Sequence, residues 1–383
     1  MRSIYSRNKV EPQQLKSALV SGASIAGLAT AYWLTELGYR VTVVELAAAP
    51  RLSGGAVNLG GPALDCVRRM GLYEQLKARA LRTDRWEFKN ADDTTAGSMT
   101  MGDDLEGPPA EDLEIERFVL IPLLQGAIQE EVEYLFSNRI VALHEAAAGV
   151  RATLVDGTQR TFDLVVGCDG VHSGVRKLWF GHETGYSQFL HHYFSLTSLD
   201  KPLLAPGLAQ FYNVPGKVVM VMDQNGKTDV AFCFYSEQEI AYDYRDTTQQ
   251  AAIVAGQFAG EGWRTAELLA EVAQANTAYF DKLCQIRMPA WTKGRVALVG
   301  DAGYCASPAA GMGGTLALAG ATALADALRQ HGGNVELALP AYDHALRPLV
   351  EEAQATALVM LNEFLVPQTE AGIQKRNAEG IPF

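Results

Sequence analysis

The feature that most constrains the fold is a strand–turn–helix–strand pattern near the beginning of the sequence. Residues 17–21 (SALVS) predict a short strand, and the segment Gly22–Gly27 (GASIAG) leads into a helix over Leu28–Leu37. A second strand follows at Tyr39–Glu45 and ends in an acidic residue. This order of elements is typical of the first unit of an open parallel α/β sheet that binds a dinucleotide.

The turn of this unit supplies the first candidate binding residues. Glycines there allow a tight turn and let a pyrophosphate approach the backbone, and the acid at the end of the second strand binds ribose hydroxyl groups. Glu45 lies 23 positions after Gly22 (45 − 22), close to the expected spacing of about 20. Its charge would repel a 2′-phosphate, so FAD or NAD is expected rather than NADP. Ser24 replaces the second glycine of the usual fingerprint, and a βαβ unit with a packing role alone is the alternative. The candidates are Gly22, Ser24, Ala26, Gly27 and Glu45.

A second glycine-rich segment, residues 293–314 (KGRVALVGDAGYCASPAAGMGG), lies late in the chain. The stretch Arg295–Gly300 predicts a buried parallel strand, and Asp301 follows where that strand ends. Glycines then begin an alanine-rich helix predicted over Thr315–Leu328, where free N–H groups and the helix dipole favour negative charge. This combination predicts a ligand with a hydroxylated linker and an electron-accepting ring, a flavin dinucleotide. An ordinary strand–turn–helix is the alternative. The candidates are Asp301, Pro308, Gly311, Met312, Gly313 and Gly314.

The loop Arg51–Gly61 (RLSGGAVNLGG) is dense in glycine and carries one cation. We interpret it as backbone that passes close under a bound ring, with Arg51 nearby; a mobile surface turn is the alternative. The candidates here are Arg51, Gly55 and Asn58.

Two more segments place charged residues next to predicted elements. Arg117 precedes a helix predicted over Phe118–Tyr134, where it is either a solvated cation or a side chain aimed at a ligand. A buried strand predicted over Phe162–Cys168 ends at Asp169, and a helix with Arg176 in its first turns follows. An acid therefore again follows a strand, as it does at the two glycine-rich segments.

Between Phe189 and Asp281 the pattern changes to alternating strands with one helical pair, which predicts a mainly antiparallel sheet. A hairpin over Thr83–Met101 is expected at the edge of another sheet, and a long helix over Leu337–Gln368 is followed by a polar end. The predicted fold class is therefore α/β, with a Rossmann-like nucleotide-binding domain, a mainly antiparallel substrate domain and a C-terminal helix. The predicted boundaries are 17–82, 102–185 and 284–335 for the first domain, 83–101 and 186–283 for the second, and 336–383 for the helix and tail.

Composition excludes several classes of function. The net charge of −12 disfavours nucleic acid and anionic membrane surfaces as partners. The five cysteines are scattered and odd in number, which argues against a disulfide framework or a zinc site and favours a reducing compartment. We find neither an apolar signal segment nor a run of about eighteen apolar residues. The sequence therefore predicts a cytoplasmic protein without a metal site. We also expect a monomer.

Four blocks, in this order, resemble the class A flavoprotein monooxygenases, which have the p-hydroxybenzoate hydroxylase fold. They are GASIAG with Glu45, EIERFVLIPLL around Arg117, DLVVGCDGVHSGVR and GRVALVGDAGYCASPAAGMGG, and the likeness extends from Ser17 to about Leu346. The third and fourth blocks are similar to the family's DG and GD motifs. The RLSGGAVNL loop, WTKGRVALVGDA and the extra C-terminal helix look most like the tetracycline-inactivating monooxygenases and their relatives.

The resemblance implies roles for the charged candidates. Glu45 would hold the adenosine ribose, and Asp301 the ribityl or pyrophosphate side of FAD. Arg117 would reach the flavin, while Asp169 and Arg176 would support both FAD and the pyridine nucleotide.

It also implies roles for the loop and the glycine-rich helix start. Gly311–Gly314 would offer N–H groups to the edge of the flavin that becomes negative on reduction, and Arg51 would lie near the nicotinamide. Three positions differ from residues frequent in the family, namely Ser24, Asn58 and Met312.

The activity that the resemblance implies uses NADPH or NADH and O2. Reduced FAD would form a C4a-hydroperoxide in a dry pocket, and this species would hydroxylate an aromatic or enolic carbon of a small molecule. No side chain is assigned as catalytic, because the chemistry belongs to the flavin. The alternatives are a flavin-bound protein that sequesters a drug without turnover and a flavin halogenase, although no tryptophan has another two positions away, as the halogenase W-x-W motif requires.

Overall fold

The structure is a computed structural model that describes residues 15–52, 54–100, 112–128, 130–275 and 278–380. Most of the polar N-terminal segment lies outside these residues, as do Ser53 in the glycine-dense loop and Met101 at the end of the predicted hairpin. In the described ranges, no helix is both long and apolar enough to cross a membrane.

A mainly parallel sheet of six strands carries the glycine-rich segments. In hydrogen-bonding order its strands are β17 (Thr292–Lys293), β18 (Val296–Leu298), β11 (Leu164–Gly167), β1 (Ser17–Ser21), β2 (Arg40–Val44) and β7 (Val132–Leu135). Neighbours are parallel except for β17 and β18. The strands β1, β11 and β18 are buried along their whole length, which explains their nearly continuous apolar sequences.

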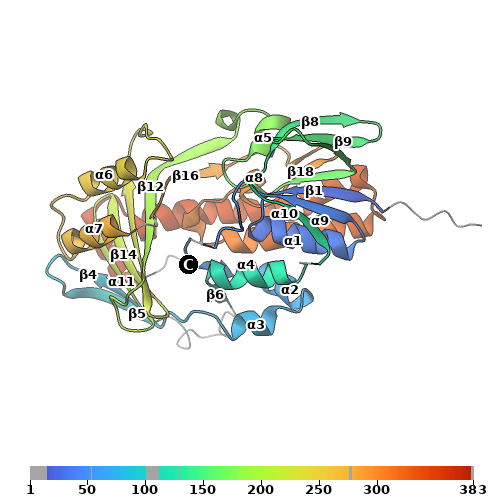
Figure 1. The fold of residues 1–383 in the computed structure, drawn as a ribbon. Coiled ribbons are helices and arrows are strands. Elements are labelled where there is room, and N and C mark those ends of the chain that lie inside the picture. Colours follow the sequence, from blue (N-terminus) through green and yellow to red (C-terminus); the bar gives the residue numbers. More distant parts are fainter. Residues whose placement is uncertain (1–14, 53, 101–111, 129, 276–277, 381–383) are drawn as a thin grey trace, which may run out of the picture.

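A sheet of seven strands forms the other large layer, seen on the left in Figure 1. Its order is β16 (Ala278–Ile286), β12 (Ser187–Leu199), β15 (Lys227–Tyr235), β14 (Lys217–Gln224), β13 (Leu208–Val214), β4 (Arg85–Lys89) and β5 (Thr95–Thr100). Only the β13–β4 pair is parallel. The predicted antiparallel sheet and the edge hairpin are therefore confirmed. The helices α6 (Thr247–Gln257) and α7 (Thr265–Gln274) cover one face, through an aromatic core that includes Phe232 and Phe258.

Smaller elements connect these layers. Two minor sheets consist of β10 (Gln159–Phe162), β9 (Gly149–Leu154) and β8 (Ile140–Ala146), and of β3 (Val57–Leu59) and β6 (Leu113–Ile115). The short helices are α2 (Pro62–Arg69), α3 (Tyr73–Lys77), α5 (Gly174–Trp179), α8 (Asp301–Tyr304), η1 (Glu183–Gly185) and η2 (Pro308–Ala310).

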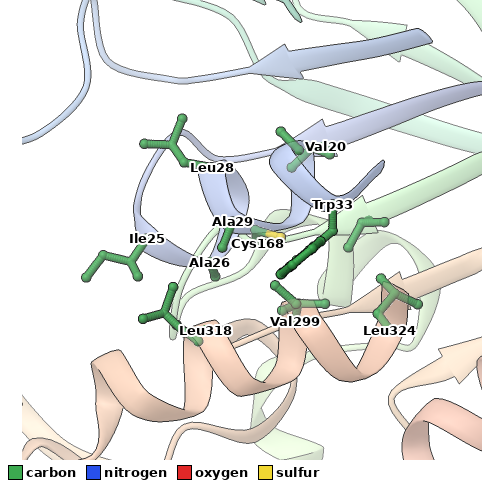
Figure 2. Close-up of a cluster of buried hydrophobic side chains, with 14 of the residues drawn as sticks. Val20, Ile25, Ala26, Leu28, Ala29, Trp33, Cys168, Val299, Leu318 and Leu324 are labelled. Atoms are coloured by element: carbon green, nitrogen blue, oxygen red, sulfur yellow. The ribbon is translucent and has the colours of Figure 1, made fainter. Parts of the chain in front are cut away.

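The core of the nucleotide-side half lies between the sheet and two apolar helices, α1 (Ile25–Glu36) and α9 (Gly313–Gln330). Figure 2 shows Leu318 and Leu324 of α9 beneath Ala29 and Trp33 of α1. Because α1 is apolar on nearly all sides, it is held between the sheet and α9 rather than lying on the surface.

The helix predicted over Phe118–Tyr134 is wrong in its second half. α4 (Arg117–Gly126) ends at a glycine, and β7 then pairs in parallel with β2 at the edge of the sheet. The apolar residues of this stretch are compatible with either a helix or a short edge strand. The strand forms because its backbone groups can pair with β2 at the edge of the sheet.

The C-terminal segment crosses from one half of the molecule to the other. α10 (Val335–Val359) packs on α9 (Figure 1). The π-helical turn η3 (Met360–Leu365) inserts Leu361 and Phe364 against the seven-stranded sheet. The polar end forms a further helix, α11 (Glu370–Glu379), beside β5 and β13, which the sequence analysis did not predict. The division into domains stays a prediction.

Candidate cofactor site

The four signature segments meet at one edge of the six-stranded sheet. β1, β2, β11 and β18 are parallel, so the residues that follow them, namely Gly22, Glu45, Asp169 and Asp301, lie at the same carboxyl edge. In open α/β sheets this edge is where ligands bind.

The turn after β1 has no room for side chains at two of its glycines. Gly22 has φ +106°, and a Cβ there would lie 2.5 Å from the carbonyl oxygen of Cys168. A Cβ at Gly27 would lie 1.9 Å from the carbonyl oxygen of Gly22. These glycines therefore allow β1, β11 and α1 to pack closely, whatever else they bind. A Cβ at Gly300 would lie 3.0 Å from the Cβ of Ala26, so the turn also borders the strand end before Asp301.

Glu45 turns its carboxylate back towards the glycine-rich turn. One oxygen accepts the N–H of Ala23 at 2.8 Å, and the other accepts the N–H of Ala47 at 2.8 Å. Ser24 occupies the N-cap position of α1, but its hydroxyl makes no capping hydrogen bond to the described helix. The first N–H groups of α1 are thus left for another acceptor.

Asp301 combines solvent exposure with a strongly desolvating environment. The residue is exposed, yet surrounding protein raises the pKa of its carboxyl, while the charge of Arg117 acts in the opposite direction. The carboxyl of Asp301 is therefore accessible to solvent although nearby protein desolvates it. The geometry suits a carboxylate that receives hydroxyl groups of a ligand.

The glycine-dense loop lies against the beginning of α9. The hydroxyl of Thr315 donates to the carbonyl of Asn58 at 3.0 Å and accepts the N–H of Gly60 at 3.1 Å. A Cβ at Gly311 would lie 3.5 Å from Nδ2 of Asn58, and one at Gly314 would lie 3.0 Å from Cβ of Val57. The structure therefore brings together two segments that the sequence separates by about 250 positions.

Other candidates lie around this contact. Met312 is half-buried at the N-cap of α9, and the nearby Pro308, Gly311 and Gly313 are exposed. Gly55 is half-buried in the glycine-dense loop, and a Cβ there would lie 2.9 Å from Cδ2 of Leu196 on β12. The exposed Arg51 begins the loop.

Arg117 lacks a complete set of partners. Its Nε is buried without a hydrogen-bond partner among the described residues. Burial lowers the pKa of the guanidinium, Asp301 raises it, and Arg51 lowers it further. A Cβ at Gly54 would lie 3.2 Å from Cδ of Arg117, so only glycine lets the loop pass over this side chain. A buried cation with an unfilled donor fits an anionic or carbonyl-bearing ligand.

Asp169 and Arg176 are used within the protein. The Ser173 hydroxyl and the N–H of Val175, at 3.0 Å, donate to the carboxylate of Asp169, which thus supports the first turn of α5 behind its N-cap, Ser173. Burial raises the pKa of the Asp169 carboxyl. Arg176 is 1% exposed, and its guanidinium donates to the carbonyls of Ala302 at 2.8 Å and Val171 at 2.5 Å. Its Nε, like that of Arg117, is buried without a hydrogen-bond partner among the described residues. Arg176 thus holds the turn after β11 against the residue that follows Asp301. This geometry supports positioning, and direct contact with a cofactor stays a prediction.

His172, in the same turn, connects the two large sheets. Its Nε2 lies 3.2 Å from a carboxylate oxygen of Asp281 on β16, and its Nδ1 lies 3.2 Å from one of Glu183. These hydrogen bonds raise the pKa of His172 to about 9.

Sequence reasoning did not identify the residues that the seven-stranded sheet contributes. Leu196 lies against Gly55, and Tyr279 on β16 is the residue that pairs with Leu196 in register. Tyr279 is 43% exposed, and desolvation raises the pKa of its hydroxyl. Asp301 and Arg117 interact electrostatically with Tyr279. In the sequence, the only signal for Leu196 and Tyr279 is the alternation of side chains along their strands. Alternation separates the two faces of each strand, but it does not show which face lies against the cofactor site.

Two other features were tested as sites. A separate hollow of about 220 Å³ is lined by residues that include Trp291, Arg347 and Gln354, none of which is a candidate above. Within the described ranges, no group of three or more His, Cys, Asp or Glu side chains is placed to hold a metal ion.

The residues of this edge fit FAD. The unfilled Nε of Arg117, the uncapped start of α1 and the accessible Asp301 are groups that a dinucleotide with a hydroxylated linker would satisfy. The assignment of single residues to parts of FAD stays a prediction.

Comparison with known proteins identifies the family. Residues 16–357 match the family model described as an FAD binding domain. A flavin-dependent monooxygenase of Legionella longbeachae is 32% identical over 351 residues, which cover 91% of this chain and 89% of that protein. The crystal structure of the tetracycline destructase Tet(51) is similar with a TM-score of 0.83 and 31% identity, covering 95% of each chain.

Klebsiella pneumoniae HpxO, solved with FAD and uric acid, has a TM-score of 0.77 at 22% identity, covering 97% of this chain and 95% of its own, which shows a shared fold. The matching family model and the monooxygenase relatives agree with the site at the carboxyl edge of the sheet. The chain therefore belongs to the FAD-binding-domain family and is a class A FAD-dependent monooxygenase.

Proposed function

We propose that this enzyme uses NADPH or NADH and O2 to hydroxylate an aromatic or polyketide-like small molecule. The observation that carries the proposal is the contact of Gly55 with Leu196, which sets the cofactor-side loop against an apolar face of the seven-stranded sheet. A ring bound on that face would lie beside the candidate flavin site and away from bulk water.

FAD, when bound, supplies the redox chemistry that transfers one oxygen atom from O2. The protein's own contribution is binding, orientation and exclusion of water. Arg117 would compensate negative charge with its unfilled donor, Asp301 would accept ligand hydroxyl groups, and the start of α9 would direct N–H groups at the ring. The loop with Gly54 and Gly55 would close one side of the site.

Tetracycline-type molecules are the first substrates to test. The similar structure of Tet(51) is titled a tetracycline destructase, at 31% identity. That title describes the neighbour, and the transfer to this chain is part of the proposal.

The test begins with purified protein and its flavin absorbance. The oxidation of NADPH and of NADH is then followed in air-saturated buffer in the presence of tetracyclines, anthraquinones or simple phenols. The masses of the products are measured by mass spectrometry. We expect one compound to stimulate oxidation and to gain one oxygen atom. Binding without stimulated oxidation would favour the sequestering protein instead, and a halide-dependent product would favour the halogenase. A flavin-free protein that does not bind added FAD would refute the proposal.

A further inference from the structure

The face of the seven-stranded sheet that borders the cofactor site can be identified from packing. Ala309 of η2, two residues before Gly311, belongs to the same buried cluster as Leu190, Cys233 and Leu283 of that sheet. The opposite face is covered by α6 and α7. The face that carries this cluster is called the inner face below.

Apolar side chains dominate the accessible part of the inner face. Trp86, Phe194, Leu196 and Met222 are half-buried and pack against the cluster. In register, Phe194 pairs with Cys233 and Leu196 with Ala231, so these side chains project from one face. Flat apolar rings suit such a surface.

Among the described residues, two acidic side chains lie on this face by register. Asp281 of β16 pairs with Phe194, and its carboxylate is engaged by His172. Asp229 of β15 pairs with Met222 and with Ser198, whose hydroxyl donates to its carboxylate.

Asp229 is 5% exposed, and its Oδ2 lies 3.9 Å from the Cβ position of Gly55. Burial raises the pKa of this carboxyl, and the nearby Lys227 partly opposes the effect. Lys227 itself is engaged elsewhere, because its Nζ lies 2.8 Å from Asp200.

The cation against this face, Arg376 of α11, is withdrawn from any ligand. It is 3% exposed, and its guanidinium donates to the carbonyl of Phe364 at 2.7 Å and to Oδ1 of Asn213 at 2.6 Å. It also lies 4.2 Å from the ring centroid of Phe88. These contacts leave Arg376 unable to meet a substrate anion without dismantling the packing of α11.

We propose that the substrate is a flat aromatic or enolic molecule that carries no carboxylate or other anionic group on the edge that lies against the inner face. An anion there would be desolvated beside Asp229, and such a contact is unfavourable. Arg376 and Lys227 already have partners, and Arg117, which lies beneath Gly54 with an unfilled Nε, is assigned above to the cofactor. A neutral or cationic edge has no such cost. The inference rests on the proposed function and narrows its substrate class.

A matched pair of ligands tests the charge preference. Hydroxynaphthoic acid and its methyl ester have the same ring and hydroxyl group, and only the acid is anionic at mildly alkaline pH. Each is titrated into the FAD-bound enzyme, with binding followed by the flavin absorption spectrum and by tryptophan fluorescence. We expect the ester to bind at least about tenfold more tightly than the acid. Equal affinities, tighter binding of the acid, or binding of neither would overturn the inference.

Asp229→Asn tests whether that carboxylate contributes, with Asp65→Asn as the matched control. Asp65 is exposed on α2, outside the seven-stranded sheet. We expect the preference for the ester to fall about threefold or more in Asp229→Asn and to stay unchanged in Asp65→Asn. A preference that persists in Asp229→Asn would remove Asp229 from the explanation. These readouts need no turnover, so a charge preference without NAD(P)H oxidation would refute the proposed function alone.

Discussion

Replacement of Arg117 by methionine separates binding function from structural support. In the protein without ligand, this guanidinium has a lowered pKa and an unpaired Nε, so its burial is a cost of about 1–3 kcal/mol. Methionine keeps much of the volume and removes the charge. We therefore expect Arg117→Met to leave the stability of the FAD-free protein unchanged or raised.

The size of the effect follows from chain length. For 383 residues the entropy of unfolding is on the order of 0.8 kcal/mol/K, so 1–3 kcal/mol corresponds to a rise in Tm of about 1–4 °C. Affinity for FAD changes in the opposite direction. Loss of a hydrogen bond from a charged donor costs about 1.5–3 kcal/mol, which weakens FAD binding about 10- to 150-fold.

The assay measures Tm of the FAD-free protein and the Kd for FAD by fluorescence quenching. Arg176→Met is the control, because this buried arginine also has an unfilled Nε but its guanidinium donates to the carbonyls of Ala302 and Val171. We expect the control to lower Tm of the FAD-free protein. If Arg117→Met lowered Tm by several degrees and left the Kd for FAD unchanged, Arg117 would be structural and our reasoning about its unfilled donor would be refuted.

Further predictions concern packing and pH. Gly27→Ala should destabilise the protein by more than about 3 kcal/mol in chemical denaturation, because the new Cβ would overlap the carbonyl oxygen of Gly22. Gly126→Ala in α4 is the control: a Cβ there has free space, so this change should stabilise the protein by about 0.5–1 kcal/mol. Similar effects of the two changes would contradict the steric explanation. Because its pKa is raised, His172 should contribute stability that is present in full below about pH 6.5 and is lost as pH rises through about 9. A plot of Tm against pH should therefore be flatter for His172→Gln than for the unchanged protein. Parallel curves would show that the ion pairs of His172 with Asp281 and Glu183 do not cause the pH dependence of Tm. Arg376→Met should cost about 2–4 kcal/mol in denaturation experiments because one buried and one partly buried acceptor lose their donor. A neutral result would show that α11 is held by its apolar contacts alone.

Local patterns predicted most of the elements correctly. The strand before Gly22, the hairpin over Thr83–Met101 and the helix after Gly311 each have a short-range signal: a buried apolar run, alternation with a turn, or glycine before an alanine-rich stretch. The prediction of a helix over the second half of Phe118–Tyr134 was wrong because the local pattern there does not distinguish a helix from a strand. Its apolar spacing is compatible with two structures, and pairing with β2, some ninety positions away, selected the strand.

Two candidate positions in the first turn have a steric requirement for glycine. Gly22 and Gly27 are required by contacts inside the βαβ unit, and their pattern is visible in about twenty residues of sequence. Asp169 and Arg176 resemble ligand-binding residues in sequence, yet their side chains are occupied by α5 and by Ala302. A motif shows that a charged residue is present but does not show where its hydrogen bonds go.

The sequence by itself determined that four strand ends, with their acids and glycines, gather at one edge of a parallel sheet. Alternating burial, glycine sterics and the parallel order of βαβ units are encoded over short stretches, so they can be read without a structure. Only the tertiary structure decided that Arg117 keeps an unfilled donor and that Gly55 meets Leu196 and Asp229. Those contacts join residues more than sixty positions apart through close packing of whole layers, and no local pattern specifies which faces of two layers will meet.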